Sequence, residues 1–203
     1  WNNSVKSAIE EIIKERKITI LTNDIDQDEM DYYKALGIKF VKGKINKLNL
    51  KRAKVETTKN IILAMRDDSE VILISYLVKT LNPACNLIGR VYNGKNLTPA
   101  KESGINHIIS PSEIGGKLLV LSLEMEEAVK WILRITTLKV GANINELTIK
   151  QKSKFLGNKI NQLKLKENKL ILGLEKNTKN TIEFFTDKNY ILKEKDTLII
   201  LEK

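Results

Sequence analysis

Two hydrophobic periodicities alternate along residues 1 to about 110, and this alternation limits the folds open to the chain. Segments with apolar residues three or four apart are typical of helices, and they alternate with short continuous apolar runs typical of buried strands. This order predicts an α/β domain built on a parallel sheet. The predicted strands are Ile18 to Leu21, Lys39 to Val41, Asn60 to Met65, Leu87 to Val91 and His107 to Ile109.

Capping residues predict where several helices begin. Asp26, with Glu29 three residues later, forms a capping-box pattern that opens a helix ending near Gly37. A short helix is predicted with Thr98 as its N-cap and Pro99 at its first position. The first helix of the chain has no strand before it, although a doubly wound domain normally opens with one. We therefore expect the intact protein to supply that strand upstream of Trp1.

The segment Ser110-Pro111-Ser112-Glu113 combines an N-cap, a proline at the first position and a capping-box acid. The helix that starts there is predicted to run toward Arg134. Its apolar residues cover too much of its circumference for packing against one small domain, so a second packing partner is expected. These residues include Leu118, Leu119, Val120, Leu121, Leu123, Val129, Ile132 and Leu133.

From about Leu138 the pattern changes to short alternating strands separated by Asn, Lys and Asp turns, which predicts a second, small domain. The predicted organisation is an α/β domain at 1–112, helices at 113–137 and a small α+β domain at 138–203. The strands expected in the last region are Leu147 to Ile149, Leu170 to Leu174, Ile182 to Phe185 and Leu198 to Leu201.

The net charge of +10 raises the question of nucleic-acid binding. The cations are spread along the chain, nearly all are lysine, and no basic stripe is interleaved with aromatic residues. We expect no nucleic-acid partner and interpret the charge as a lysine-rich solvated surface.

Composition also argues against catalysis and disulfide stabilisation. Cys85 is the only cysteine and His107 the only histidine, so the sequence offers no disulfide framework and no pairing of a nucleophile with a base. We expect a structural role for His107, no enzymatic activity and a reducing, cytoplasmic location. No apolar run approaches the ~20 residues of a membrane-spanning helix.

An ordered set of short stretches resembles the RCK (KTN) regulatory domains of potassium channels and of Trk/Ktr-type potassium uptake systems. The first part of the chain is similar to the RCK-N (TrkA-N) domain, which has a Rossmann-like fold, and the tail from Val140 resembles RCK-C (TrkA-C). The stretches are Asn60-Ile61-Ile62-Leu63-Ala64, Asp67-Asp68-Ser69-Glu70, Leu81-Asn82-Pro83, Ile88-Gly89-Arg90-Val91, Glu102-Ser103-Gly104-Ile105 and Ile108-Ile109-Ser110-Pro111.

The resemblance implies a ligand-sensing gating module at the inner face of the cell membrane, acting on a potassium-channel pore. A soluble, nucleotide-responsive subunit of an uptake system is the alternative. Family members form homodimers that assemble into a homo-octameric ring, and they pair through the helix after the Ile-Ser-Pro segment. The residues expected at that dimer interface are Leu118, Leu119, Leu123, Met125, Trp131 and Ile132. A helix bridging two domains of one chain remains the other interpretation.

Family members sense nucleotides or divalent cations, and both signatures are altered here. A dinucleotide site needs an acid after the second strand, where Thr22 stands, followed by Asn23 and Asp24. Asn23 and Asp24, with Asn2, Asn3 and Ser4 at the first helix N-terminus, remain candidates for a smaller or different anion.

The usual calcium site of related archaeal channels is predicted to be absent, because Ala64, Arg90 and Tyr92 occupy its acid positions. Arg90, with Arg66 on the neighbouring strand, instead favours an anion such as phosphate. Asp67 and Ser69, next to Arg66, complete the predicted ligand site. Two surface arginines paired with nearby acids are the simpler alternative. The cofactor thus remains open between a nucleotide and another anion.

Overall fold

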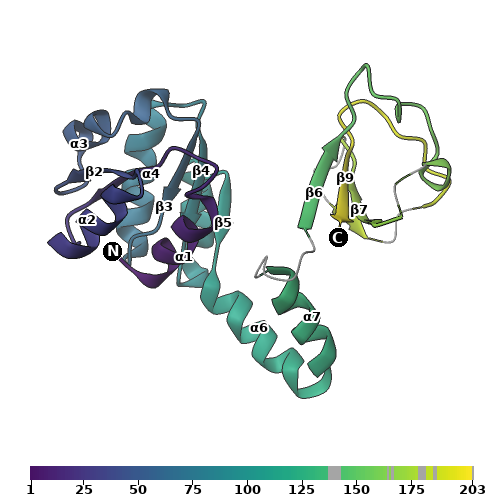
Figure 1. Ribbon diagram of the computed structural model, residues 1–203, viewed down its shortest axis with the longest axis horizontal. Coiled ribbons are helices and arrows are strands. Elements are labelled where there is room, and N and C mark those ends of the chain that lie inside the picture. The colour runs from purple at the N-terminus through teal and green to yellow at the C-terminus, as the bar shows by residue number, and fades with distance from the viewer. Residues whose placement is uncertain (137–142, 164, 166, 178–181, 185–186, 203) are drawn as a thin grey trace. The chain divides into compact units, whose positions relative to one another are not determined.

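The computed structural model describes residues 1–136, 143–163, 165, 167–177, 182–184 and 187–202. The chain divides into two compact units, Trp1–Val120 and Leu121–Lys203 (Figure 1). Among the described helices, none combines the length and the apolar character needed to cross a membrane.

The first unit alternates helices with parallel strands, so the predicted Rossmann-like α/β fold is confirmed. The strand β1 pairs with β2, and β3, β4 and β5 form a separate sheet in that order. The elements are α1 (Asn3–Ile12), β1 (Thr19–Thr22), α2 (Gln27–Ala35), β2 (Lys39–Lys42), α3 (Lys47–Arg52), β3 (Asn60–Leu63), α4 (Asp68–Leu81), β4 (Asn86–Arg90), α5 (Leu97–Glu102), β5 (His107–Ile109) and α6 (Pro111–Glu124).

Each sheet of this unit has an open edge. Within the described part of the chain, β1 has β2 as its only strand partner and β3 has only β4. The two sheets nevertheless share packing, because Leu21 of β1 contacts the core cluster that includes Leu63 of β3 and Leu87 of β4. On the opposite side, Ile9 of α1 packs with Tyr33 of α2. The strand expected upstream of Trp1 stays a prediction.

Two helix boundaries differ from the sequence expectation. The helix α5 begins at Leu97, so Thr98 lies inside it and is not its N-cap. A turn of 3₁₀ helix at Gly94–Asn96 leads directly into α5, and the Asn96 side chain donates to Asp68 instead of capping the helix.

The single long helix expected from Ser110 toward Arg134 is two helices. The helix α6 ends at Glu124, and α7 (Glu126–Thr136) begins after Met125. Glu126 and Glu127 lie in the first turn of α7, where carboxylates interact favourably with the helix dipole. The clustered acids therefore favour a new helix start.

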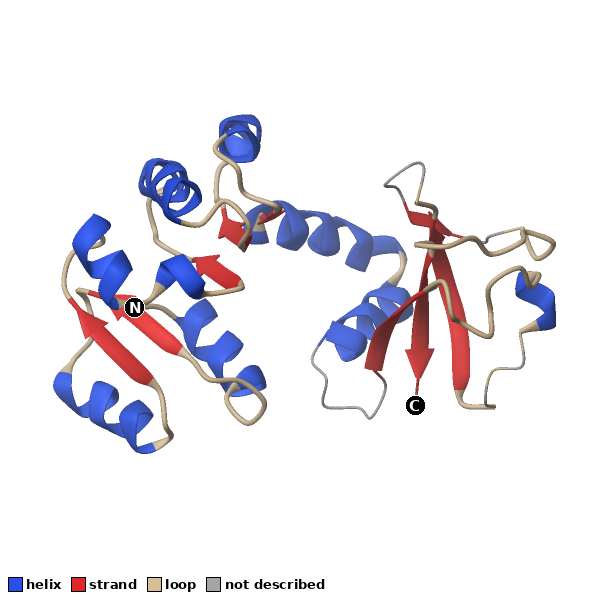
Figure 2. Ribbon diagram, turned by 90° about the horizontal axis from the view of Figure 1, so that it is seen from above, coloured by secondary structure: helices blue, strands red, loops and turns tan. Residues whose placement is uncertain are grey.

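The second unit carries an antiparallel sheet, whose strands are red in Figure 2, and the alternating pattern predicted strands in this region. The strand order is β6-β9-β7-β8. Its core is formed by Ile149, Leu174, Leu192, Leu198 and Ile200. Phe185, predicted to end one strand, lies outside the described residues. The strands are β6 (Asn143–Thr148), β7 (Lys169–Glu175), β8 (Ile182–Phe184) and β9 (Thr197–Glu202).

A buried carboxylate fixes the turn before β9. Asp196, 1% exposed, accepts hydrogen bonds from the Tyr190 hydroxyl at 3.1 Å and from the Lys193 backbone N–H at 2.8 Å. Burial, together with the Asp196 carboxylate, raises the pKa of Tyr190 to about 12. The residue before Asp196, Lys195, adopts a left-handed conformation with φ of 67°.

Replacing Lys195 with glycine is expected to stabilise the chain by about 0.5–1 kcal/mol, because glycine adopts a positive φ without the steric cost that lysine bears. Calorimetry would measure the change in the free energy of unfolding. Lys193→Gly is the matched control: Lys193 lies outside the left-handed region, so there glycine adds only an entropic cost. Equal effects of the two substitutions would contradict the prediction.

Candidate anion site

Arg90, at the carboxyl end of β4, is buried and anchors the candidate site. Only 6% of the residue is exposed. Its guanidinium donates to the carbonyl oxygens of Ala64 at 2.8 Å and Met65 at 3.1 Å, in the segment that follows β3. The same guanidinium donates to Asn2 Oδ1 at 3.0 Å. The arginine therefore joins the ends of two strands to the start of α1.

Asn2 is the N-cap of α1 and uses both ends of its amide. Its Oδ1 accepts from the Val5 backbone N–H at 3.2 Å, and its Nδ2 donates to Ala64 O at 2.9 Å. The first turn of α1 is thereby fixed beside Arg90. A helix N-terminus carries unpaired N–H groups and a partial positive charge, both of which favour an anion.

A cavity of about 300 Å³ opens between these groups. Three of its lining residues carry positive charge and none is acidic, so the cavity has a positive potential. Arg66 is exposed and makes no hydrogen bond or ion pair with the described residues, which leaves its guanidinium available to a ligand. The lining residues are Trp1, Asn2, Asn3, Lys6, Arg66, Arg90 and Tyr92.

Two donor atoms of the lining residues, Trp1 Nε1 and Arg90 Nε, are buried without a partner. The Nε of Arg90 makes no hydrogen bond, in a residue otherwise almost fully satisfied. A buried donor left unpaired costs about 1–3 kcal/mol, more when it is charged. An anionic oxygen that reached Arg90 would remove this cost.

Asp68, the first residue of α4, holds the loop after β4. Its carboxylate accepts from the backbone N–H groups of Tyr92 at 2.8 Å and Asn93 at 2.9 Å, and from the Asn96 side chain at 2.9 Å. Burial acts to raise the pKa of Asp68, but these hydrogen bonds and the nearby Arg90 charge outweigh it, so the pKa lies below its ordinary value. Asp68 is thus a positioning residue, facing the loop.

The structure brings together part of the predicted site. Asn3, Arg66 and Arg90 line the cavity, whereas Asn23, Asp24, Asp67 and Ser69 do not. The Ser4 side chain lies outside the described part of the structure. Asp24 lies with its carboxylate 3.7 Å from the Trp1 backbone nitrogen. Asp67 caps α4 by accepting from Ser69 N at 2.7 Å, so both serve the helix start.

Three lining residues were missed by the sequence analysis: Trp1, Lys6 and Tyr92; Asn2 belonged to the predicted helix N-terminus. Asn2 and Lys6 are one helical turn apart, and Tyr92 follows the carboxyl end of β4, so position relative to the predicted elements was the available signal. Lys6 forms an ion pair with Glu29 of α2, and its Nζ lies 5.9 Å from the centre of the Trp1 ring. Trp1 itself packs edge-on against Tyr33.

At the positions where the resemblance implied the acids of a calcium site, Ala64 and Arg90 offer no side-chain oxygen. Ala64 offers only its carbonyl, which already accepts from Arg90 and Asn2, and Arg90 brings a positive charge. Across the described residues, no group of three His, Cys, Asp or Glu side chains is placed to hold a metal ion. The donor set at this edge suits an anion.

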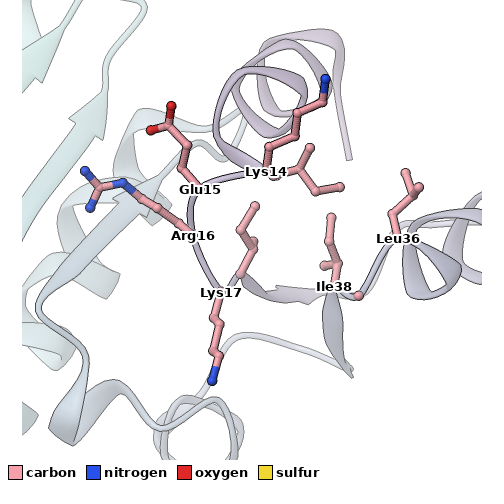
Figure 3. A pocket seen from close by; sticks show the side chains of 9 residues that line it. Lys14, Glu15, Arg16, Lys17, Leu36 and Ile38 are labelled. Atoms are coloured by element: carbon pink, nitrogen blue, oxygen red, sulfur yellow. The ribbon is translucent and has the colours of Figure 1, made fainter.

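A second cavity, of about 330 Å³, lies at the opposite edge of the first unit, beside the amino end of β1. Figure 3 shows Glu15, Arg16 and Lys17 pointing away from Leu36 and Ile38. No polar groups converge in it, and ligands of α/β sheets bind at the carboxyl ends of strands. This cavity is the weaker ligand site.

Comparisons with known proteins agree with this architecture. Residues 1–111 match the model of the TrkA-N domain family. An uncharacterized protein of Methanothermus fervidus is 32% identical over 113 residues, and the match covers 55% of this chain but only 18% of that protein. The TrkA-N domain of the inner membrane protein ybaL from Escherichia coli has a TM-score of 0.54 at 18% identity, covering 59% of this chain and 88% of that domain. The RCK domain of GsuK has a TM-score of 0.42 at 18% identity, covering 100% of this chain and 48% of that one.

An α/β unit of this topology, with a basic cavity at the carboxyl edge of its strands, defines a domain of the Rossmann-like class. The chain belongs to the TrkA-N domain family, through residues 1–111. The RCK-C assignment of 138–203 and the predicted limits of the 113–137 segment stay predictions.

Asp68→Asn is expected to lower the free energy of unfolding at pH 7 by about 1–3 kcal/mol, because an amide cannot accept all three hydrogen bonds. The lowered pKa of Asp68 means that its carboxylate stabilises the fold above the unfolded pKa, near 3.8. This contribution is lost as the pH falls from about 4 through the lower pKa that Asp68 has in the folded state. Urea denaturation from pH 7 to 3 would show that Asp68→Asn loses less unfolding free energy below pH 4 than the unmodified chain does. The control Asp28→Asn, at an exposed acid of α2, should follow the unmodified chain. An equal loss of unfolding free energy below pH 4 in Asp68→Asn and in the unmodified chain would contradict the role assigned to Asp68.

Proposed function

We propose that this chain is the ligand-sensing regulatory module of a potassium channel, in which an anion bound in the first unit shifts the equilibrium between pore states. The observation that carries the proposal is the cavity lined by Arg66, Arg90 and the N-terminus of α1, without an acid among its lining residues. Membership of the TrkA-N family supports the regulatory role. The module is regulatory and not enzymatic.

The ligand is a nucleotide or another phosphate-bearing anion. Arginine binds phosphate oxygens through charge-assisted, often bidentate hydrogen bonds, and Arg66 has its donors available. Tyr92, 42% exposed, adds an aromatic surface to the same cavity, against which a planar group can pack. Phosphate and aromatic ring together are the chemistry of a nucleotide.

The partner is a second copy of the chain, with pairs assembling into a homo-octameric ring below the pore. Leu119 and Leu123 lie four residues apart on α6 and are 74% and 84% exposed. Met125 and Trp131 are 56% and 52% exposed, while Leu118 and Ile132 are half-buried. Apolar surface of this extent marks an interaction site, which supports the predicted dimer interface.

A soluble, nucleotide-responsive subunit of a Trk/Ktr-type uptake system is the second candidate, and the same cavity and apolar helices would serve it. Both candidates place the module in the cytoplasm at the inner face of the membrane. The residues that precede Trp1 in the intact protein distinguish them, because a channel requires pore helices and a filter segment on the same polypeptide.

Calorimetric titration of the chain with ATP, NAD and pyrophosphate tests the ligand class. Arg66→Ala is expected to weaken binding about tenfold or more, since one charge-assisted hydrogen bond contributes about 1.5–3 kcal/mol. Arg16→Ala removes the same charge beside the other cavity and should leave the affinity within about twofold. Absence of any heat of binding with all three anions, or equal losses in the two variants, would contradict the proposed site.

Sedimentation velocity tests the dimer. The chain is expected to sediment as a dimer or larger species, and Leu119→Asp combined with Leu123→Asp is expected to give a monomer, because two carboxylates would be buried without partners. Leu48→Asp, at an equally exposed leucine of α3 (68%), should leave the assembly unchanged. A monomeric unmodified chain, or a double variant that still associates, would contradict the proposed dimer interface.

A further inference from the structure

We propose that the hydrogen bond between Ser112 and Tyr92 couples the occupied cavity to α6, so that the ligand signal leaves the first unit through the first turn of this helix. This inference rests on the proposed function and adds the route of regulation. It is carried by a short series of contacts from Arg90 through Tyr92 to Ser112.

The first contact lies inside the cavity. The ring of Tyr92 lies over the Arg90 guanidinium, with 4.7 Å between the ring centre and the guanidinium carbon. Both residues line the cavity, and Arg90 Nε is buried without a hydrogen-bond partner. The ring covers the guanidinium and both residues line the cavity, so an anion that enters the cavity contacts the Arg90–Tyr92 pair.

The backbone of Tyr92 is held at both its N–H and its carbonyl oxygen. The N–H donates to the buried Asp68 carboxylate at 2.8 Å, and Asn93 N and the Asn96 side chain donate to the same carboxylate. The loop from Tyr92 to Asn96 is therefore attached to α4. A ligand that contacts Tyr92 thus contacts a segment joined to α4 on one side and to α6 on the other.

The last contact reaches α6. The Ser112 hydroxyl donates to the Tyr92 carbonyl oxygen, and Ser112 lies in the first turn of α6. Glu113 lies against the same loop: a Cβ built on Gly94 would come within 2.4 Å of its Oε1. Side chains of two consecutive α6 residues thus lie on the loop that borders the cavity. The same helix carries Leu119 and Leu123 of the proposed dimer interface.

Hydrogen exchange across residues 111–124, with and without saturating ATP or pyrophosphate, tests the coupling. The unmodified chain is expected to show a ligand-induced change of about fivefold or more in exchange rate, the lower end of typical coupling between sites. Ser112→Ala removes the hydroxyl and is expected to reduce the change to less than about twofold while calorimetry shows the same affinity for the anion. Ser112→Thr retains the hydroxyl and should restore the response.

Each outcome decides between the two proposals. An anion that binds with the same induced change in Ser112→Ala overturns the coupling and leaves the proposed function standing. Failure of ATP and pyrophosphate to bind the unmodified chain overturns the proposed function and this inference with it. Should Ser112→Ala fail to fold, Ser112→Val, which matches threonine in shape but has no hydroxyl, takes its place, and an undiminished response in that variant would equally overturn the coupling.

Discussion

The buried guanidinium of Arg90 joins the end of β3 to the start of α1, two segments that no described strand pairing connects. No described strand joins β1 to β3, and the start of α1 is tied to the end of β3 by side chains: Arg90 and Asn2 both donate to Ala64 O. A buried cation normally has to be paired or neutralised, and here carbonyl dipoles and an amide oxygen take that role. The positive charge therefore remains uncompensated by an ion pair within the described part, which makes the cavity attractive to an anion.

Much of the fold could be predicted from the sequence because it depends on local patterns. The strand positions follow from apolar runs, and the start of α2 follows from Asp26, which accepts from Glu29 N at 2.8 Å as the capping pattern requires. One error arose where a distant group competes for a capping residue. Asn96 donates to Asp68, 28 positions away, so the start of α5 could not be read from Thr98 and Pro99 alone.

The candidate site was harder to predict, because its contacts are long-range. The pattern placed Arg90 at a strand end, but its burial depends on Asn2, which is 88 residues away in sequence. Asp67 and Ser69 were predicted to bind the ligand, but the Asp67 carboxylate accepts a hydrogen bond from the Ser69 backbone N–H at the start of α4. Asp68, one position further along, holds the loop that carries Tyr92, a role that requires the fold of β4 beside α4. Sequence spacing therefore predicted the edge of the sheet at which the site lies, but not which residues line the cavity and which hold the backbone around it.

The NMR signal of the Arg90 Nε–H group tests most directly whether an anion binds beside Arg90. The chain has only five arginines, so each signal can be assigned by substitution. The account predicts a slowly exchanging Nε–H signal for Arg90, because the atom is buried without a partner. It also predicts that this signal shifts on titration with pyrophosphate or ATP, while the Arg16 signal stays in place. An Arg90 signal that exchanges rapidly with water, or that is unmoved at saturating concentrations of both anions, would contradict the account.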